Sequence, residues 1–144
     1  MRTLLLLAAA AVALAPAASA APAATPSPCT LVTADDAGKA LGGKTAKGKA
    51  QTLGLYKACT YTRGRRTVTV LVRQIAKATF EKSAKKNPPP VFPIPGVGDE
   101  AFSAGGGSSL LVWQKGTEVT FTFAGFNAVV QAQKDIAKAA LKRL

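Results

Sequence analysis

The fold is decided by residues 58–73, which read ACTYTRGRRTVTVLVR. Two runs rich in β-branched and aromatic side chains, 58–62 and 67–73, are separated by Arg63-Gly64-Arg65-Arg66, a pattern typical of a β-hairpin. The second run is apolar at alternate positions, namely Val68, Val70 and Val72. Because side chains of a strand alternate between two faces, this strand is expected to be buried on one face only.

A short helix and an edge strand are predicted ahead of the hairpin. Thr33-Ala34-Asp35-Asp36 resembles a capping box with Asp in place of Glu, so a helix is expected to follow Thr33 and to end at Leu41, before Gly42-Gly43. Residues 44–53 alternate weakly and contain several lysines, which discourage an edge strand from pairing with other chains.

The second half of the chain repeats this order of elements. Residues 75–86 have helical periodicity, and Asn87-Pro88-Pro89-Pro90 ends the helix because proline cannot continue it. An extended, stiff crossing is expected as far as residue 98. Strands follow at 100–103, 109–114 and 118–124, and a last helix at 128–144. The order α-β-β-β-α-β-β-β-α indicates an α+β fold, an antiparallel β-sheet layered with three helices.

Residues 1–20 have the three parts of a secretory signal peptide. Arg2 gives a positive start, an apolar run extends from Leu4 to Leu14, and Ala18-Ser19-Ala20 is a small-x-small cleavage site. The run is shorter than the about 20 residues that span a bilayer, so no transmembrane segment is predicted. We expect a secreted, extracellular protein in which a flexible Pro/Ala-rich lead segment, 21–28, precedes a single domain, 29–144.

Cys29 and Cys59 are the only cysteines of the chain. Two cysteines in an exported protein indicate a disulfide, and a metal pair is disfavoured because the chain has no histidine. Lipid attachment at Cys29 is the competing interpretation. Free secretion is favoured, because Pro26-Ser27-Pro28 does not resemble the small and aliphatic residues that precede a lipidated cysteine.

The charge of the chain is strongly positive and unevenly placed. Its net charge is +12, and thirteen Lys or Arg residues but a single acid, Glu81, lie between Lys39 and Lys86. Such asymmetry favours an anionic partner, for example a wall polymer, an anionic lipid or an acidic protein, although a basic surface that only keeps the protein soluble is the alternative. Nucleic acid is disfavoured, because only Tyr56 and Tyr61 lie among the basic residues.

No constellation of catalytic residues is found in the sequence. The commonest general base, histidine, is missing. Asp99 and Glu100 are adjacent, so in a strand they would point to opposite faces. Ser108-Ser109 lacks a nucleophile elbow, and no Lys-Ser/Thr follows Gly105-Gly106-Gly107 as in a phosphate loop. The sequence therefore predicts no enzyme, no catalytic residue, no cofactor and no metal.

Seven residues form the predicted binding surface: Arg63, Arg65, Arg66, Leu71, Arg73, Trp113 and Lys115. The three arginines at the hairpin tip are expected to point outward. If Leu110 and Val112 face the core, the side chains of Leu111, Trp113 and Lys115 point the other way. An aromatic beside aliphatic and basic groups suits an amphiphile, a glycan or a partner protein. The alternative is that a helix covers this face and Trp113 belongs to the core.

The order of several short motifs resembles an actinobacterial family of secreted proteins and lipoproteins of unknown function. The motifs are Cys29, Leu41-Gly42-Gly43, Cys59-Thr60-Tyr61 and the stretch Gly96 to Phe102. The layout is more remotely similar to extracellular sensor domains of bacterial Ser/Thr kinases. The resemblance implies export, one disulfide and an α+β fold, and it carries no catalytic residue.

These observations favour a secreted, non-catalytic binding or cell-envelope-associated module for an anionic polymer, lipid or protein partner. The alternative is a small extracellular enzyme inhibitor that presents the Pro-rich loop 88–95 as a stiff, pre-formed contact. A hydrolase of unrecognised type ranks last.

Overall fold

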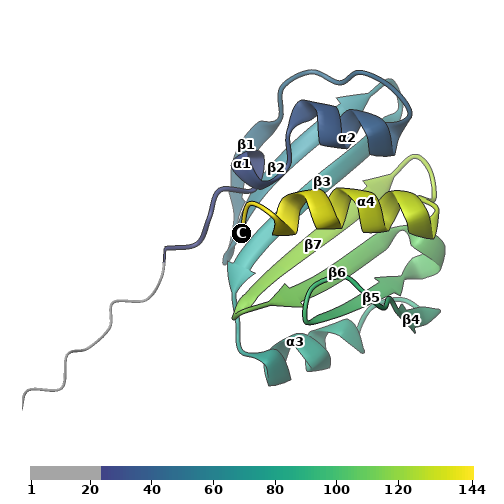
Figure 1. Ribbon diagram of the computed structural model, residues 1–144. Helices are drawn as coiled ribbons and strands as arrows, with labels where there is room; N and C mark the ends of the chain where they lie inside the picture. The colour runs from purple at the N-terminus through teal and green to yellow at the C-terminus, as the bar shows by residue number, and fades with distance from the viewer. Residues whose placement is uncertain (1–23) are drawn as a thin grey trace, which may run out of the picture.

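The computed structural model describes residues 24–144, which fold around a seven-stranded antiparallel sheet (Figure 1). The strand order from edge to edge is β1-β2-β3-β7-β6-β5-β4. The strands are β1 (Lys49–Leu53), β2 (Tyr56–Arg63), β3 (Arg66–Gln74), β4 (Val91–Pro93), β5 (Glu100–Ala104), β6 (Ser109–Gln114) and β7 (Thr117–Ala124). The antiparallel sheet with its helices confirms the predicted α+β class.

Helices pack on both faces of the sheet. They are α1 (Pro28–Leu31), α2 (Ala34–Leu41), α3 (Lys77–Ala84) and α4 (Val130–Leu141), and a 3-10 turn, η1, spans Gly105–Gly107. One face carries α1, α2 and α4, which contact β2, β3 and β6, and the other face carries α3 alone, over β6 (Figure 1). We call these the three-helix face and the α3 face.

The core lies between the sheet and the three-helix face, as the alternation of the strands predicts. Val68, Val70 and Val72 of β3 are fully buried there beside Val119 and Phe121 of β7. A smaller cluster lies under α3 and contains Phe80, Ala84, Ala104 and Leu111. The main core therefore lies on one face of the sheet, and the other face is covered only beneath α3.

The ends of α2 follow the predicted signals. The Thr33 hydroxyl accepts a hydrogen bond from the Asp36 backbone N–H, and the Asp36 carboxylate accepts one from the Thr33 N–H, so the capping box is confirmed. Gly42 ends the helix in the left-handed region, at φ 83°. The other two predicted helices are shorter than expected, since α3 begins at Lys77 and α4 ends at Leu141. α1 and β4 were not predicted.

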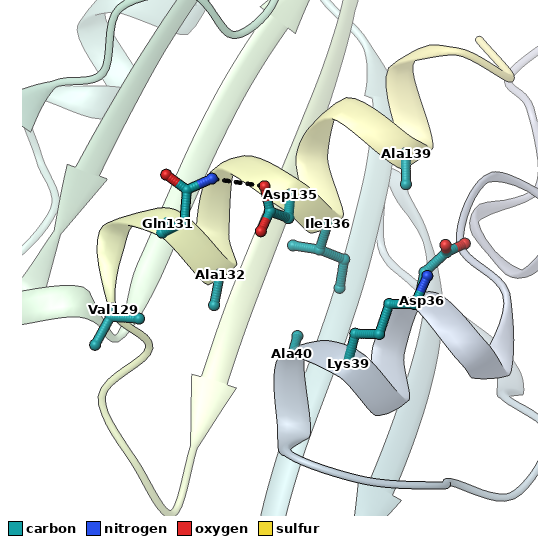
Figure 2. A pocket seen from close by; sticks show the side chains of 9 residues that line it. All are labelled: Asp36, Lys39, Ala40, Val129, Gln131, Ala132, Asp135, Ile136 and Ala139. Atoms are coloured by element: carbon teal, nitrogen blue, oxygen red, sulfur yellow. Dashed lines mark hydrogen bonds between the residues drawn. The ribbon is translucent and has the colours of Figure 1, made fainter.

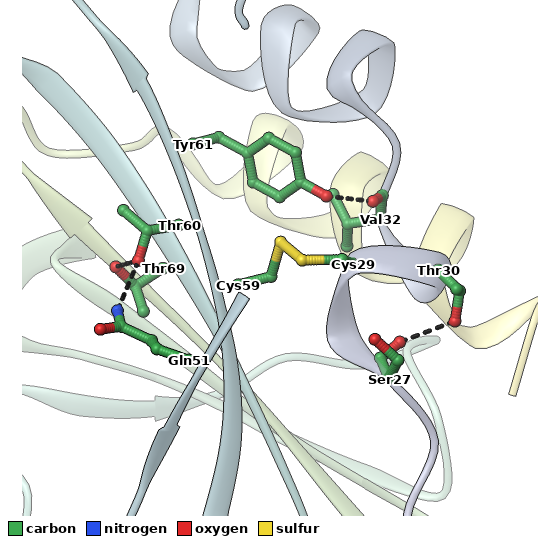
Figure 3. The surroundings of a disulfide bond; sticks show 9 residues. All are labelled: Ser27, Cys29, Thr30, Val32, Gln51, Cys59, Thr60, Tyr61 and Thr69. Carbon is green, nitrogen blue, oxygen red and sulfur yellow. Dashed lines mark hydrogen bonds between the residues drawn. A yellow bond between two sulfur atoms is a disulfide. The ribbon is translucent and has the colours of Figure 1, made fainter. Parts of the chain in front are cut away.

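The predicted disulfide joins Cys29 of α1 to Cys59 of β2 (Figure 3). Cys59 is fully buried, and beside it the hydroxyl of Tyr61, also in β2, donates a hydrogen bond to the backbone oxygen of Val32. Burial is the main cause that raises the pKa of Tyr61, and the Asp36 carboxylate adds to it. The covalent and the hydrogen-bonded link together hold the segment around α1 against the sheet.

The predicted signal peptide, 1–20, lies outside the described residues. The end of the predicted lead segment differs from expectation, because Pro28 is buried at the start of α1 and the Lys57 ammonium donates a hydrogen bond to the backbone oxygen of Thr25, at 2.6 Å. No helix within residues 24–144 is long and apolar enough to cross a membrane.

Candidate functional site

The part of the sheet that α3 leaves uncovered carries a regular array of threonines. Side chains at alternate positions of β2, β3 and β7 point to this side, because the intervening residues face the core. The array, which we call the threonine face, consists of Thr60, Thr62, Thr67, Thr69, Thr120 and Thr122. All six are half-buried or exposed.

The strand register aligns one row of this face across four strands. Lys49 of β1 pairs with Thr60, Thr60 with Thr69, and Thr69 with Thr122. Neighbouring strands are about 4.8 Å apart, so the row presents hydroxyls at a regular spacing. The hydroxyls of Thr60 and Thr69 are 3.1 Å apart, and the Gln51 amide donates to the Thr60 oxygen at 3.2 Å (Figure 3). The row is thus a pre-formed line of donors and acceptors.

A groove of about 430 Å³ lies where the threonine face meets the end of α3. It is lined by Tyr56, Leu71, Ser83, Lys86, Asn87, Pro88, Leu111, Glu118, Thr120 and Thr122. Thr122, the last threonine of the aligned row, lines this groove together with Lys86, so the surface carries Lys49 on its β1 side and Lys86 in the groove. The aligned row and the groove form one continuous surface, which we treat as the candidate site.

An ion pair lies at the side of this groove. Glu118 is only 2% exposed; its Oε2 accepts a hydrogen bond from Nε of Arg73 at 2.6 Å and forms an ion pair with Nη2, also at 2.6 Å. Its Oε1 accepts a hydrogen bond from Thr120 at 3.0 Å. The Arg73 guanidinium also lies over the Tyr56 ring, 4.5 Å from the centroid. Burying two charges costs free energy even when they are paired, so this ion pair differs from the solvent-exposed ion pairs that are common on protein surfaces.

The pKa of Tyr56 is raised mainly by burial. The Glu118 carboxylate raises it further, and the Arg73 guanidinium opposes the shift. Tyr56 therefore stays a neutral hydroxyl at the side of the groove across the physiological pH range. With Glu118 neutralised by Arg73, Lys86 is the unpaired charge among the residues that line the groove.

The structure separates the seven predicted binding residues into three places. All three arginines of the hairpin are exposed, but two of them also contact the rest of the fold. Arg63 donates to the backbone oxygen of Leu41 at the end of α2, and the Arg66 guanidinium lies 5.3 Å from the centre of the Phe126 ring. Both fold back toward the three-helix face, where a cation beside the last turn of a helix is favourable. Arg65 remains exposed at the turn.

The other predicted residues lie along the α3 face or beyond it. Leu71 and Arg73 belong to the candidate site, as described. Trp113 packs against the cluster under α3, and its indole N–H donates to the Ile75 oxygen at 3.0 Å, but it is half-buried and so is neither a core residue nor fully exposed. Lys115 lies in the β6–β7 turn, at the far end of the sheet from the arginines. The sequence did not single out Tyr56, Glu118 or the threonines, although the alternation of Thr in three strands was a visible signal.

A second hollow lies between α2 and α4 (Figure 2). Its volume is about 510 Å³, and it is lined by Asp36, Lys39, Ala40, Val129, Gln131, Ala132, Asp135, Ile136 and Ala139. Burial disfavours the charge of Asp36, but hydrogen bonds from Thr33 and Arg143 outweigh it and hold the pKa of this carboxyl below its ordinary value. The Asp135 carboxylate accepts from the Gln131 amide at 2.7 Å (Figure 2). Both carboxylates of this hollow thus have hydrogen-bond partners within the protein.

Metal-ligating groups do not gather in the part of the chain that the structure describes: no three His, Cys, Asp or Glu side chains lie close enough to hold an ion. Asp99 accepts a hydrogen bond from the Lys115 backbone N–H, and Glu100 lies 3.8 Å from the Lys77 ammonium. Both acids thus have structural partners.

Comparison with known proteins finds no family model, no curated protein and no solved structure that matches this chain.

Proposed function

We propose that this chain is an exported, non-catalytic binding module that holds an anionic polymer of the cell envelope on its threonine face. The observation that carries the proposal is the aligned row of Lys49, Thr60, Thr69 and Thr122, together with Lys86 in the groove that Thr122 also lines. Lysines attract carboxylate or phosphate groups, and hydroxyls can donate to and accept from the hydroxyls of a sugar or polyol backbone.

The electrostatics of the site favour a negative ligand. The one carboxylate that lines the groove, Glu118, is already paired with Arg73, so it does not repel an anion as a free carboxylate would. The exposed Arg65 lies beyond Thr62 and Thr67, at the turn between their strands, and extends the positive border. The threonine face is thus a specific surface, bordered by basic residues, on which an extended anionic chain can lie.

Export is part of the proposal and is supported by two features. The predicted signal peptide at residues 1–20 directs the chain out of the cell, and the Cys29–Cys59 disulfide is the kind of bond that persists in an oxidising compartment. The resemblance to secreted actinobacterial proteins points the same way.

Adsorption to soluble polymers tests the site. Hyaluronate oligomers supply carboxylates on a hydroxyl-rich backbone, polyphosphate supplies charge alone, and dextran supplies hydroxyls alone. We expect hyaluronate to bind, and its binding to weaken between low salt and about 0.15 M salt, where the Debye length is about 8 Å. The triple variant T60V/T69V/T122V, which removes three hydroxyls and keeps β-branched side chains, should weaken hyaluronate binding severalfold.

Matched controls separate the site from net charge. K49S/K86S removes the lysine of the row and the lysine of the groove, and K134S/K138S removes the same charge from α4. The first pair should lose most of the binding and the second little. Equal losses from the two pairs, or tighter binding of polyphosphate with no effect of the threonine variant, would show that only net charge matters and would overturn the proposed site.

A second candidate function is favoured by the position of Phe92. The Pro-rich segment is not a free loop, because it forms the edge strand β4 and is held by hydrogen bonds from Ile94 N–H to Ala101 and from Gly105 N–H to Pro88. Phe92 nevertheless projects from it, 56% exposed. An ordered segment with an exposed aromatic suits an inhibitor of an extracellular enzyme. Inhibition of a secreted protease or glycosidase that is lost in F92A and kept in K49S/K86S would support this function.

A further inference from the structure

Large apolar side chains are exposed at one end of the sheet. In the described part of the chain, Leu55 is 86% exposed, Leu53 46% and Leu144 39%. Leu53 and Leu55 belong to the tip of the β1–β2 hairpin, where Leu53 pairs with Tyr56 across a turn of Gly54 and Leu55. Gly54 has φ 60°, which glycine adopts without strain, so the turn is tight and Leu55 stands at its outermost point.

Lysines lie at the same end of the sheet as this tip, and the one next to it, Lys57, donates a hydrogen bond to the Thr25 backbone oxygen. The strand register places the start of β2, the end of β3 and the β6–β7 turn at one end of the sheet. Gln74 at the end of β3 pairs with Thr117 of β7, and Thr117 pairs with Gln114 of β6. Lys57 follows the hairpin tip directly, and Lys115 lies in the turn between β6 and β7. Lys142 and Leu144 border a hollow that also contains Gln74 and Lys115. This end, which we call the leucine–lysine end, combines exposed leucines with several cations.

The acids near this end offset only part of its charge. Glu118 is bound by Arg73, and Asp99, which accepts a hydrogen bond from the Lys115 backbone N–H, is a single carboxylate against Lys57, Lys115 and Lys142. The arginine turn is at the opposite end of the sheet, since Arg63 pairs with Arg66 there. Lysines beside an apolar tip are the arrangement in which the tip enters hydrocarbon while ammonium groups remain among anionic headgroups.

From this arrangement we infer that the leucine–lysine end docks on an anionic lipid bilayer and inserts Leu53 and Leu55 into it. A bilayer is favoured over a protein partner because two side chains at a hairpin tip are too small for a stable protein interface, which needs about 1,000 Å² of buried surface. Interfacial insertion requires a depth of only about 5–10 Å, which a hairpin tip reaches without any change in the fold. The contact is separate from the threonine face, so one can fail without the other.

Two apolar side chains and several lysines give a reversible contact. Burying one leucine side chain strengthens binding by about tenfold or more, and each lysine near an anionic surface contributes a further severalfold. Removing both leucines should therefore weaken vesicle binding by roughly 100-fold. The same change should leave the folded structure intact, because both side chains lie outside the core clusters.

Co-sedimentation with vesicles tests the inference. The disulfide-bonded protein from a secreting host is mixed with phosphatidylcholine vesicles with and without phosphatidylglycerol. We expect binding only to the anionic vesicles, its loss in L53S/L55S, and no loss in V129S/V130S, which removes two exposed valines, 70% and 49% exposed, from the start of α4. Equal losses from both double variants, or full binding by L53S/L55S, would overturn the inference.

A local probe distinguishes insertion from adsorption. In L55W the new indole fluorescence, after subtraction of the Trp113 signal measured in the wild type, should shift to shorter wavelength on anionic vesicles and be quenched by brominated acyl chains. T60V/T69V/T122V should bind vesicles like the wild type, so its loss of hyaluronate binding would concern the threonine face alone. If L55W sediments with the vesicles but its new indole fluorescence neither shifts nor is quenched, the contact is purely electrostatic and the inferred insertion is wrong.

Discussion

Removing the disulfide is expected to destabilise the domain by an amount set mainly by the unfolded chain. The perturbation is the double substitution C29A/C59A, which leaves no unpaired thiol. The two cysteines are 30 residues apart in sequence. In the chain-entropy model, opening a loop of this length lowers the free energy of unfolding by roughly 3.5 kcal/mol at 25 °C.

The folded state should change little in this variant. The Tyr61 hydroxyl still binds the Val32 oxygen, and the Arg143 guanidinium still donates to the Leu31 oxygen at 2.8 Å. These contacts keep the segment after α1 on the sheet without the covalent link. Loss of the buried Cys59 sulfur adds a small packing cost, so a total of about 3–5 kcal/mol is expected.

Urea denaturation of the wild type and of C29A/C59A, both followed by near-ultraviolet circular dichroism and Trp fluorescence, measures this difference. The native spectra should agree, and the midpoint should fall. The urea dependence should steepen slightly, because the unlinked chain exposes more surface when it unfolds. A loss below about 1 kcal/mol would mean that the bridge is peripheral and would refute the reasoning.

Three further predictions concern other parts of the molecule. Gly48→Ala should lower the free energy of unfolding by about 1–3 kcal/mol, because a Cβ at this position would stand 2.6 Å from the Tyr61 ring, and an unchanged denaturation midpoint would contradict the packing described here. Asp36 has a lowered pKa in the folded state, so it contributes stability that is present above its ordinary value of 3.8 and is lost as the pH falls through its folded pKa. Asp36→Asn should therefore be less stable than the wild type at pH 7, with a difference that shrinks below about pH 4, and a difference independent of pH would contradict the assigned hydrogen bonds. The secreted protein should begin at Ala21 and contain no free thiol, as intact-mass measurement with and without reductant can show; lipid on Cys29 would contradict both parts.

The sequence predicted the elements whose signals are local. The capping box at Thr33 and the alternating valines of β3 each depend on neighbours in the chain, and the structure contains both. The disulfide was predictable from the count of cysteines alone. α1 was missed because four residues are too few for a periodic pattern. β4 was missed because the prolines around it indicated an extended segment that does not pair with another strand.

The site was harder to predict because it depends on strand register. Arg73 and Glu118 are 45 residues apart, and nothing in the sequence says that β3 pairs with β7 in the register that makes them neighbours. Lys86 and Thr122 line the same groove only because α3 packs on the same face of the sheet as the threonines. The strand pattern of β6 correctly placed Trp113 away from the main core. It could not show that Trp113 would pack against the small cluster under α3.

The aligned row is tested most directly by mapping where an anionic polymer contacts the protein. Titration of the ¹⁵N-labelled protein with short hyaluronate oligomers reports the contact residue by residue as changes in amide chemical shift. The largest changes are predicted at the residues of the row and groove, around Thr60, Thr69, Thr122 and Lys86, with little change along α4. Changes that are concentrated between α2 and α4, or that follow every exposed lysine and arginine equally, would contradict a binding site on the threonine face.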